Sequence, residues 1–592
     1  MGSVKQSKKF KKTHLKDKVR REREHQKKIS HRKVKKSSTL KQPQKNEFKV
    51  NVPKASFEAY MSESDDNDDA KQVQDEEQEY LNGIEASSAS EDEEETAVLQ
   101  EKGLTITTKQ ISEWSETLTS NPKAIPQVIK ALANEDQIPD LAAVDALTNL
   151  GLGKLPDSLK ETLPVDNNRI PIPSKRLSSL NPYLKSYYRF LCGLVKNGTN
   201  KRIAKILMAL KKSLPYFVGF KAHKELAQAL VSVVINPAVS DETKLSTFGI
   251  MKEACAQYPA TLLDTFMKSA YEGLLRFSKT CNAHTLPTIN LAKNLFGTLY
   301  GIAPSKGFQM AFQQIRSLAL NLKASLDKKK NPEMDINVIY TWQFVQSIDY
   351  FSRVIALCGQ ASDNIEDGNN PLLQLIHPLV QITLRTSTLV SKSAYLPLRF
   401  YLVRSLIRLC RHTGVYIPLT PVLVEALQSS AVTRKALKSS LPQFDFEHNI
   451  HAPESYLGTQ VYQNGINDEL VDLIAEYLVL YCKSIAFPEI AGPVCITLGR
   501  FTKKNVHNVR INKQIKALLE RIDANSEFIH RKRSNVLFGP RDKEQVAAFL
   551  KEEDWDKTPL GSFVVTRRRI SEERRRLMQQ TDENVDENDF EE

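Results

Sequence analysis

Helical spacing of apolar residues is the feature that most constrains this fold, and it persists from about residue 105 to about residue 525. Apolar side chains recur every three or four positions between 466 and 481, and again between 511 and 522. This spacing is that of one face of an α-helix. The alternating pattern of a half-buried strand is nearly absent. The sequence therefore predicts an all-α protein.

Short breaks rich in proline, glycine and aspartate separate the helical runs, and such residues end helices and turn the chain. They read NPYL at 181, LPYFVGF at 214, INPAVSD at 235 and ASDNIEDGNNP at 361. Helix pairs that follow one another for over 400 residues indicate a HEAT/armadillo-like α-solenoid, with room for about ten repeats. The sequence shows no clean period, so a single irregular helical bundle is the alternative.

The two ends of the chain differ in composition from this helical region. Residues 1–50 carry 19 Lys and Arg against 4 Asp and Glu, whereas residues 51–100 carry 2 against 16. Blocks of like charge repel themselves and bury little apolar surface. We expect a basic disordered arm at 1–50, an acidic disordered segment at 51–104, an α-helical repeat body at 105–525, and an extended, mostly irregular tail with one short helix at 526–592.

Basic clusters in the arm and tail are the candidates for RNA-phosphate contact or nuclear targeting. A polar solvated helix is the alternative for residues 16–36. The candidates are Lys8, Lys9, Lys11, Lys12, Arg20, Arg21, Lys35, Lys36, Arg531, Lys532, Arg533, Arg567, Arg568 and Arg569.

The acidic segment holds serines that precede acidic residues, the context that an acidophilic kinase prefers. Ser62, Ser64 and Ser90 are the candidate phosphorylation sites, and phosphate would deepen the negative charge of the segment. The alternative is that the segment only keeps the protein in solution.

No catalytic or cofactor motif stands out. The sequence lacks G-x-x-x-x-G-K-[ST], G-x-S-x-G, H-E-x-x-H and G-x-G-x-x-G, and its seven cysteines form no C-x-x-C pair. His448 and His451 have no cysteine or acidic cluster at ligand spacing, so we expect no metal site. No apolar run approaches a membrane span, and the N-terminus lacks a signal-peptide core. We predict a soluble intracellular protein that is not an enzyme and has no cofactor, membrane partner or small-molecule substrate.

One apolar helix between 396 and 413 carries a narrow row of arginines. Arg404, Arg408 and Arg411 fall within about 60° of one another on a helical wheel. Three interpretations compete: a solvated edge paired with acids of the next repeat, an interface with an acidic partner protein, and a contact with RNA phosphates. These three arginines are the candidate partner-binding residues. The aromatic run between 340 and 351 has two interpretations, core packing and stacking on bases.

Long strings between about 170 and 563 resemble the nucleolar complex protein 2 family. The strings are YTWQFVQSIDYFSRV at 340, HPLVQITL at 377, YLPLRFYLVRSLIRLCRHTGVYIPL at 395, LPQFDFEHNIHAPESYLGTQVYQNG at 441, SIAFPEIAGPV at 484, LGRFTKKNV at 498, ALLERIDANSEFIHRKRSNVLFGPRD at 517 and TPLGSF at 558.

The resemblance implies a non-catalytic scaffold in ribosome biogenesis, located in the nucleus, in the nucleolus and nucleoplasm. It implies heterodimers with the related larger nucleolar complex proteins of types 1 and 3. It also implies contact with pre-60S particles and pre-rRNA, with a part in rRNA processing, large-subunit maturation and intranuclear movement. An importin-like transport adaptor is the alternative, because that class also stacks helical repeats.

Overall fold

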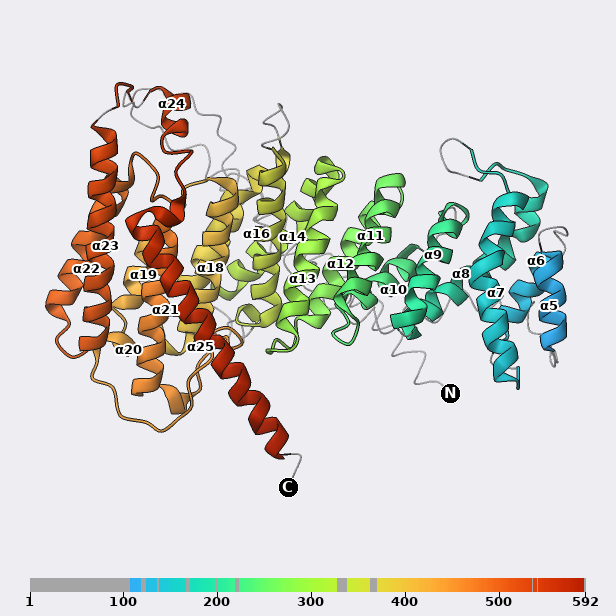
Figure 1. Cartoon of the computed structure of the whole chain (residues 1–592), viewed down its shortest axis with the longest axis horizontal. Coiled ribbons are helices and arrows are strands. Elements are labelled where there is room, and N and C mark those ends of the chain that lie inside the picture. The colour runs from blue at the N-terminus through green and yellow to red at the C-terminus, as the bar shows by residue number, and fades with distance from the viewer. Residues whose placement is uncertain are drawn as a thin grey trace, which may run out of the picture. The chain divides into compact units, whose positions relative to one another are not determined.

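The computed structural model describes residues 107–589, except 119–123, 136–137, 167–170, 199, 219–222, 327–337, 363–369, 535 and 540. Over this part the chain forms α-helices, short 3-10 turns and two isolated β-bridges, and no strand (Figure 1). The all-α prediction is confirmed. The predicted basic arm and acidic segment, with their candidate lysines, arginines and serines up to Ser90, lie outside the described residues.

The first eight described helices contact one another in two alternating rows. Each helix contacts the next but one, and neighbours such as α8 and α9 also touch across the rows. We call the rows the odd row and the even row. The odd row contains α5 (Thr108–Thr117), α7 (Leu141–Thr162), α9 (Asn200–Phe217) and α11 (Asp241–Gln257), and the even row contains α6 (Ala124–Ala133), α8 (Lys175–Asn197), α10 (His223–Ile235) and α12 (Leu263–Phe277).

Helix α8 shows why these segments are helical. The Ser174 side chain accepts a hydrogen bond from the Leu177 amide and so satisfies a backbone donor at the helix start. Leu184, Tyr187 and Leu191 recur at helical spacing and are fully buried. The helix therefore has one apolar face against its neighbours and one face toward solvent.

The central helices pack around the aromatic helix α16. Tyr350 and Phe351 are fully buried, and Phe344 is nearly so, which confirms core packing for these three residues of the aromatic run, whereas Tyr340 and Trp342 are half-buried. Gly414 ends α18 in the left-handed conformation (φ 67°), which glycine adopts without steric cost. The helices are α13 (Leu286–Gly297), α14 (Pro304–Leu326), α16 (Trp342–Ser362), α17 (Ile376–Thr388) and α18 (Leu396–Thr413).

The C-terminal region is helical as well, so the predicted extended and mostly irregular tail is wrong. Leu560 and Val564, four residues apart, are both buried, and α25 contacts α21 and α23 (Figure 1). Tertiary packing thus stabilises a segment that its charge alone makes look unstructured. The helices are α19 (Thr420–Leu427), α20 (Ser430–Thr433), α21 (Gln460–Val479), α22 (Phe487–Lys504), α23 (Val509–Arg533), α24 (Lys543–Ala548) and α25 (Pro559–Asp589).

The seven cysteines form no disulfide in the structure, and all except Cys495 are buried. Within the described ranges, none of the helices is both long enough and apolar enough to cross a membrane.

Candidate functional site

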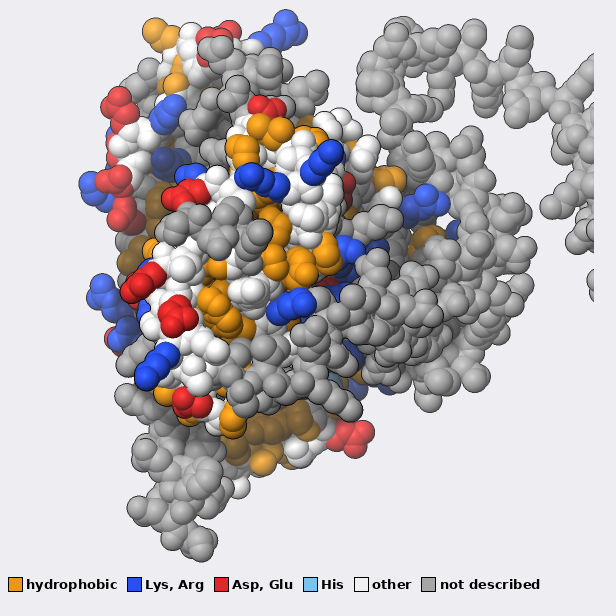
Figure 2. Space-filling model, turned by 90° about the vertical axis from the view of Figure 1, so that its right-hand side faces the viewer, with side chains coloured by type: hydrophobic (Ala, Val, Ile, Leu, Met, Phe, Trp, Pro, Cys, Tyr) orange, Lys and Arg blue, Asp and Glu red, His pale blue; other side chains and the backbone are white. Residues whose placement is uncertain are grey.

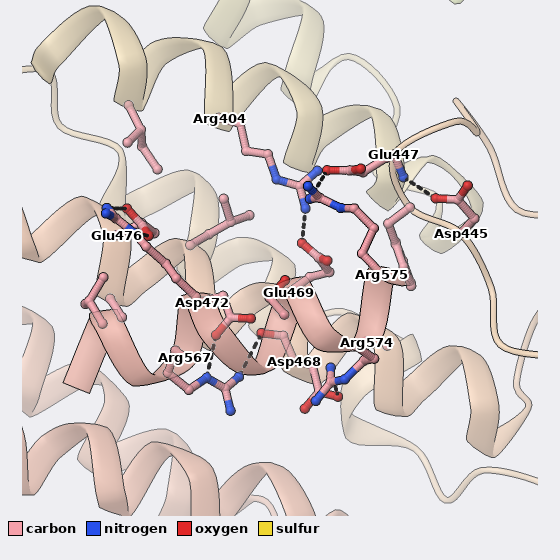
Figure 3. Close-up of a pocket in the computed structure, with 18 of the residues that line it drawn as sticks. Arg404, Asp445, Glu447, Asp468, Glu469, Asp472, Glu476, Arg567, Arg574 and Arg575 are labelled. Atoms are coloured by element: carbon pink, nitrogen blue, oxygen red, sulfur yellow. Dashed lines mark hydrogen bonds and ion pairs between the residues drawn. The ribbon is translucent and has the colours of Figure 1, made fainter. Parts of the chain in front are cut away.

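Helices α18, α21 and α25, together with the loop at 443–448, line a cleft of about 410 Å³ (Figure 3). Arginines from α18 and α25 face carboxylates from α21 and the loop across it. The two groups of arginines lie more than 150 residues apart in sequence. The structure therefore brings the predicted partner-binding arginines of α18 and two of the predicted RNA-binding arginines of α25 into one site.

Four carboxylates on one side of α21 form the acidic wall of the cleft. Asp468, Asp472 and Glu476 are spaced by four residues, which places them in one row along the helix, and Glu469 lies beside them. Ile466 and Leu470 occupy the buried side of the same helix. The alternation of buried and acidic positions directs the carboxylates away from the core.

The three predicted arginines of α18 are paired within the chain. Arg404 binds Glu469, and Arg411 Nη2 lies 3.1 Å from Glu476 Oε2. Arg408 Nη1 lies 2.5 Å from Asp349 Oδ1 of α16. These contacts agree with the interpretation that the arginines pair with acids of neighbouring helices.

Asp349 is the buried centre to which Arg408 is tied. Its carboxylate also accepts hydrogen bonds from Lys293 Nζ at 2.5 Å and Arg353 Nε at 2.9 Å. Burial lowers the pKa of Lys293 to about 7, against the opposing effect of Asp349. The three cations hold the pKa of Asp349 well below its usual range, although burial acts in the opposite direction. Lys293, Arg353 and Arg408 therefore share the Asp349 carboxylate as an ion-pair partner.

The arginines of α25 close the cleft from the other side. Arg567 Nε lies 2.5 Å from Asp472, Arg568 Nε 2.5 Å from Glu476, Arg574 Nη1 2.9 Å from Asp468 and Arg575 Nη2 2.5 Å from Glu447 (Figure 3). The Arg568 guanidinium also lies over the Trp555 ring, 5.0 Å from its centroid. Helix α25 is therefore a basic segment bound in cis to an acidic row.

The start of α25 needs a glycine to reach this position. A Cβ atom on Gly561 would lie 1.8 Å from the Trp555 carbonyl oxygen, so no other residue fits without a backbone shift. The Thr558 hydroxyl accepts a hydrogen bond from the Gly561 amide at 3.0 Å, which caps the first turn. The Leu560 amide donates to the buried Asn525 side chain of α23. These contacts fix the direction of α25 and so the positions of its arginines.

Several ionisable groups of the cleft have shifted pKa values, and those of Asp472 and His448 are raised. Burial raises the pKa of Asp472 to about 6, and the nearby carboxylates of Glu469 and Asp468 add to this, while Arg567 opposes it. A hydrogen bond with Asp445 raises the pKa of His448. The acidic row is therefore crowded, and the arginines of α25 compensate its charge.

The remaining predicted basic residues lie outside the cleft. Lys532 Nζ is 2.8 Å from Glu553, and Arg533 Nη1 is 2.7 Å from Glu489. Arg531 and Arg569 are exposed. Sequence analysis missed the acidic row of α21, although carboxylates at 468, 472 and 476 show the spacing of one helix face.

The carboxylates of the cleft are all engaged by hydrogen-bond donors of the chain. Each of the six carboxylates that line the cleft accepts a hydrogen bond from an arginine, a histidine or a backbone amide. Among the residues that the structure describes, no group of three or more His, Cys, Asp or Glu side chains could hold a metal ion. The fold and the site define an all-α protein in which ion pairs across a cleft hold α25 against α21 and the loop at 443–448.

Comparison with known proteins gives the family. Residues 261–567 match the Noc2p family, and an uncharacterised NOC2 family protein of Schizosaccharomyces pombe is 33% identical over 83% of this chain and 72% of its own length. The chain therefore belongs to the Noc2p family. The matched residues contain α18, α21 and the beginning of α25, whereas α5 to α11 lie before them.

Two further relatives carry descriptive names. Nucleolar complex protein 2 of Drosophila melanogaster is 27% identical over 70% of this chain and 54% of its own length. Nucleolar complex-associated protein 2 of Arabidopsis thaliana is 28% identical over 57% of this chain and 43% of its own length. The chain thus spans about half the length of these two relatives.

Proposed function

We propose that this protein is a non-catalytic scaffold of ribosome biogenesis that acts in the nucleus, in the nucleolus and nucleoplasm. It forms heterodimers with the larger nucleolar complex proteins of types 1 and 3 and accompanies pre-60S particles during their maturation and intranuclear movement. Membership of the Noc2p family, with relatives named as nucleolar complex proteins, is the observation that carries the proposal.

The helical architecture supports a scaffold role. The alternating contacts of the odd and even rows fit a HEAT-like α-solenoid, in which each repeat touches only its neighbours and the stack offers a long surface. In the cleft, Asp472 and Asp468 are engaged by Arg567 at 2.5 Å and Arg574 at 2.9 Å, so a substrate would have to displace a guanidinium to reach either carboxylate. Both features favour a binding surface over a catalytic site.

The candidate partner-binding residues of α18, Arg404, Arg408 and Arg411, line the cleft. Arg404 and Arg408 are held in partly buried ion pairs, so their reversal would disturb the fold as well as a partner. Arg411 is 45% exposed and Arg575 is 53% exposed, so both can exchange their intramolecular acids for those of a partner. Arg411 is therefore the residue with which to test partner binding.

The decisive experiment is purification of the tagged full-length chain from cells, followed by identification of bound proteins and RNA. We expect larger nucleolar complex proteins and large-subunit precursor RNA to co-purify, and R411E to reduce recovery of the protein partner several-fold. The matched control is K516E, at an exposed lysine of α23. Recovery of neither precursor RNA nor nucleolar complex proteins would refute the scaffold proposal.

The acidic row of α21 is the observation that favours the importin-like alternative, because basic cargo signals bind acidic surfaces. Helix α25 already covers this row. A chain truncated before Arg567 should bind a fluorescent lysine-rich nuclear signal peptide more tightly than the full chain if the alternative holds. Equal, weak binding by both would exclude it.

A further inference from the structure

Two stretches of the helical region carry basic residues and no acid. Residues 490–519, which contain most of α22 and the start of α23, hold six lysines and arginines and no aspartate or glutamate. Residues 426–444, which contain α20, hold three lysines and arginines and no acid either. Over the whole chain acids are nearly as frequent as basic residues, 70 against 83, so the two stretches differ from the rest of the protein.

The fold brings the two stretches together. Asn508, at the turn between α22 and α23, donates a hydrogen bond from Nδ2 to the Val432 carbonyl oxygen of α20 at 3.1 Å. Gln463 of α21 donates to the Arg434 carbonyl oxygen at 2.8 Å and so holds the segment that follows α20. In Figure 1, α20 lies near the ends of α22 and α23 that this turn joins. The basic residues of both stretches therefore share one region of the surface.

Seven cations of this region reach solvent. Their side chains are exposed and have no hydrogen-bond or ion-pair partner among the residues that the structure describes. The three on α22 fall within about 100° on the helical wheel, opposite the buried Val494 and Leu498. Lys516 is not counted, because Glu520 follows it one turn later on α23. We call the seven residues the hairpin surface, and they are Arg434, Lys435, Lys438, Arg500, Lys503, Lys504 and Lys513.

Acids on the neighbouring helices are bound to other cations. Helix α23 packs against α21 and α22 packs against α19. Asp468 of α21 is 7% exposed and accepts hydrogen bonds from Arg510 and Arg574, while Glu425 of α19 binds Arg399. The other carboxylates of α21 face the arginines of the cleft. The positive potential of the hairpin surface is therefore not offset by ion pairs with these acids.

The opposite side of Figure 1 shows a different distribution of charge. Figure 2 views the molecule from the side on which α5, α6 and α7 lie, and both acidic and basic side chains appear there. Arg202 and Lys212 of α9 pair with Asp145 and Asp157 of α7. Unpaired positive charge is thus not a general property of the described surface.

Three aliphatic side chains accompany the cations. Leu437 is 73% exposed, Val506 75% and Val509 73%, which places them among the most exposed large apolar residues of the described chain. Val506 and Val509 flank Asn508, which contacts α20, and Leu437 lies in the segment after α20. Exposed apolar residues that gather in one region indicate an interaction site.

Aliphatic residues among cations suit an acidic protein segment better than RNA. Proteins that bind single-stranded nucleic acid stack bases on aromatic side chains. Residues 434–438 and 500–513 contain no exposed phenylalanine, tyrosine or tryptophan, since Phe501 is half-buried. Protein interfaces instead combine apolar contacts with complementary charge.

We infer that the hairpin surface docks an acidic segment of another protein, in which apolar side chains alternate with aspartates and glutamates. The cations attract the carboxylates, and Leu437, Val506 and Val509 contact the apolar side chains. This inference goes beyond the proposed scaffold function, because it adds a surface outside the cleft and the chemistry of the partner that fits it.

The test uses the full-length chain and a synthetic glutamate-rich peptide with photoleucine at every third or fourth position. Light-induced crosslinks are mapped by mass spectrometry, so binding at the hairpin surface is distinguished from binding at other basic residues. Variant R500Q/K503Q/K504Q/K513Q removes four cations of the surface. Its matched control K160Q/K205Q/K252Q/K279Q removes four exposed lysines elsewhere. Circular dichroism and thermal denaturation verify folding of each variant.

We expect crosslinks within 434–438 and 503–513 of the unmodified chain. They should fall by at least about tenfold in the four-cation variant and by less than about threefold in its control. V506S/V509S should lower them several-fold, whereas L141S/M208S, at two other exposed apolar residues, should not. A second peptide, with serine in place of all but one photoleucine, should crosslink equally to the chain with and without V506S/V509S.

Absence of crosslinks at the hairpin surface of the unmodified chain would overturn the inference while leaving the scaffold proposal intact. Equal crosslinking of the four-cation variant would also overturn it. Protection of Lys504 and Lys513 from acetylation by an oligouridylate, but not by the acidic peptide, would overturn it as well and assign the surface to RNA.

Discussion

The C-terminal cleft and the contact between α7 and α9 both bring positive side chains against carboxylates, yet the two regions differ in how deeply these ion pairs are buried. In the cleft, arginines of α18 and α25 meet the carboxylates of α21 within hydrogen-bond distance. Between α7 and α9, Arg202 pairs with Asp145 and Lys212 pairs with Asp157, and all four side chains are at least half exposed. The comparison teaches that the burial of an ion pair decides how much its charge contributes to the fold.

The two regions also differ in what their charge does for folding. In the cleft, the burial of Leu560 and Val564 docks α25 and the ion pairs orient it, so charge there helps to define the fold. The pairs between α7 and α9 lie at the surface, where water and salt screen their charges. Their charge therefore contributes less to packing than the charge of the cleft does.

The largest expected effect follows from removal of the buried acid behind the cleft. Asp349→Ala leaves Lys293, Arg353 and Arg408 without their shared carboxylate, and we expect a loss of about 3–5 kcal/mol in the free energy of unfolding. Chemical denaturation measures it. Lys293→Met should cost much less, because burial already disfavours the lysine charge. Equal losses in the two variants would contradict the view that the acid is the limiting partner.

The next effect concerns the start of α25. Gly561→Ala places a methyl group against the Trp555 carbonyl, and we expect a loss of about 1–3 kcal/mol from the forced backbone shift. Gly499→Ala is the matched control, since its Cβ would meet nothing within 4 Å in α22. That control should gain up to about 1 kcal/mol from helix propensity. Similar melting temperatures for both variants would show that α25 is not docked as described.

A smaller effect distinguishes cleft ion pairs from exposed ones. A double-mutant cycle of Arg567 and Asp472, which are 16% and 23% exposed, should give a coupling of about 1–2 kcal/mol. The cycle of Lys212 and Asp157, which are 51% and 55% exposed, should give below about 1 kcal/mol. Thermal denaturation at low and high salt provides both. The comparison between the regions fails if the exposed pair couples more strongly.

The smallest effect is pH-dependent and lies at the rim of the cleft. Because Asp445 raises the pKa of His448 above its ordinary value of 6.5, protonated His448 stabilises the fold below that value. The contribution is lost as the pH rises through the raised pKa. His448→Gln should therefore lower the melting temperature at about pH 5.5 more than at about pH 8.5. Asp445→Asn should remove this difference, and a pH-independent effect of His448→Gln would contradict the assignment.

Much of the fold was predictable because helical periodicity is local. The apolar spacing between 466 and 481 indicated α21, and the breaks at 214, 235 and 361 marked helix ends. The predicted break NPYL at 181 was wrong, because Pro182 lies inside α8. Most of the aromatic run of α16 was correctly assigned to core packing. The prediction of an irregular tail was wrong because Leu560 and Val564 are only two apolar residues in a charged segment. Their burial depends on contact with α23, which no local sequence pattern reveals.

The site was predictable in part. The arginine row of α18 was visible as a row, and pairing with neighbouring acids was one of its three interpretations. The sequence did not show that arginines of α18 and α25 share the carboxylates of α21, since Arg568 and its partner Glu476 lie 92 residues apart. Pairing over such a distance depends on how helices stack, which sequence spacing does not encode.

By itself, the sequence determined that this chain is helical and basic, because periodicity and net charge are properties of the residues in order. The tertiary structure decided which positive charges are neutralised. The electrostatic attraction of an arginine for distant anions is cancelled only when the fold places a carboxylate against it. The arginines of α25 bound to the carboxylates of α21 are the clearest result of that decision.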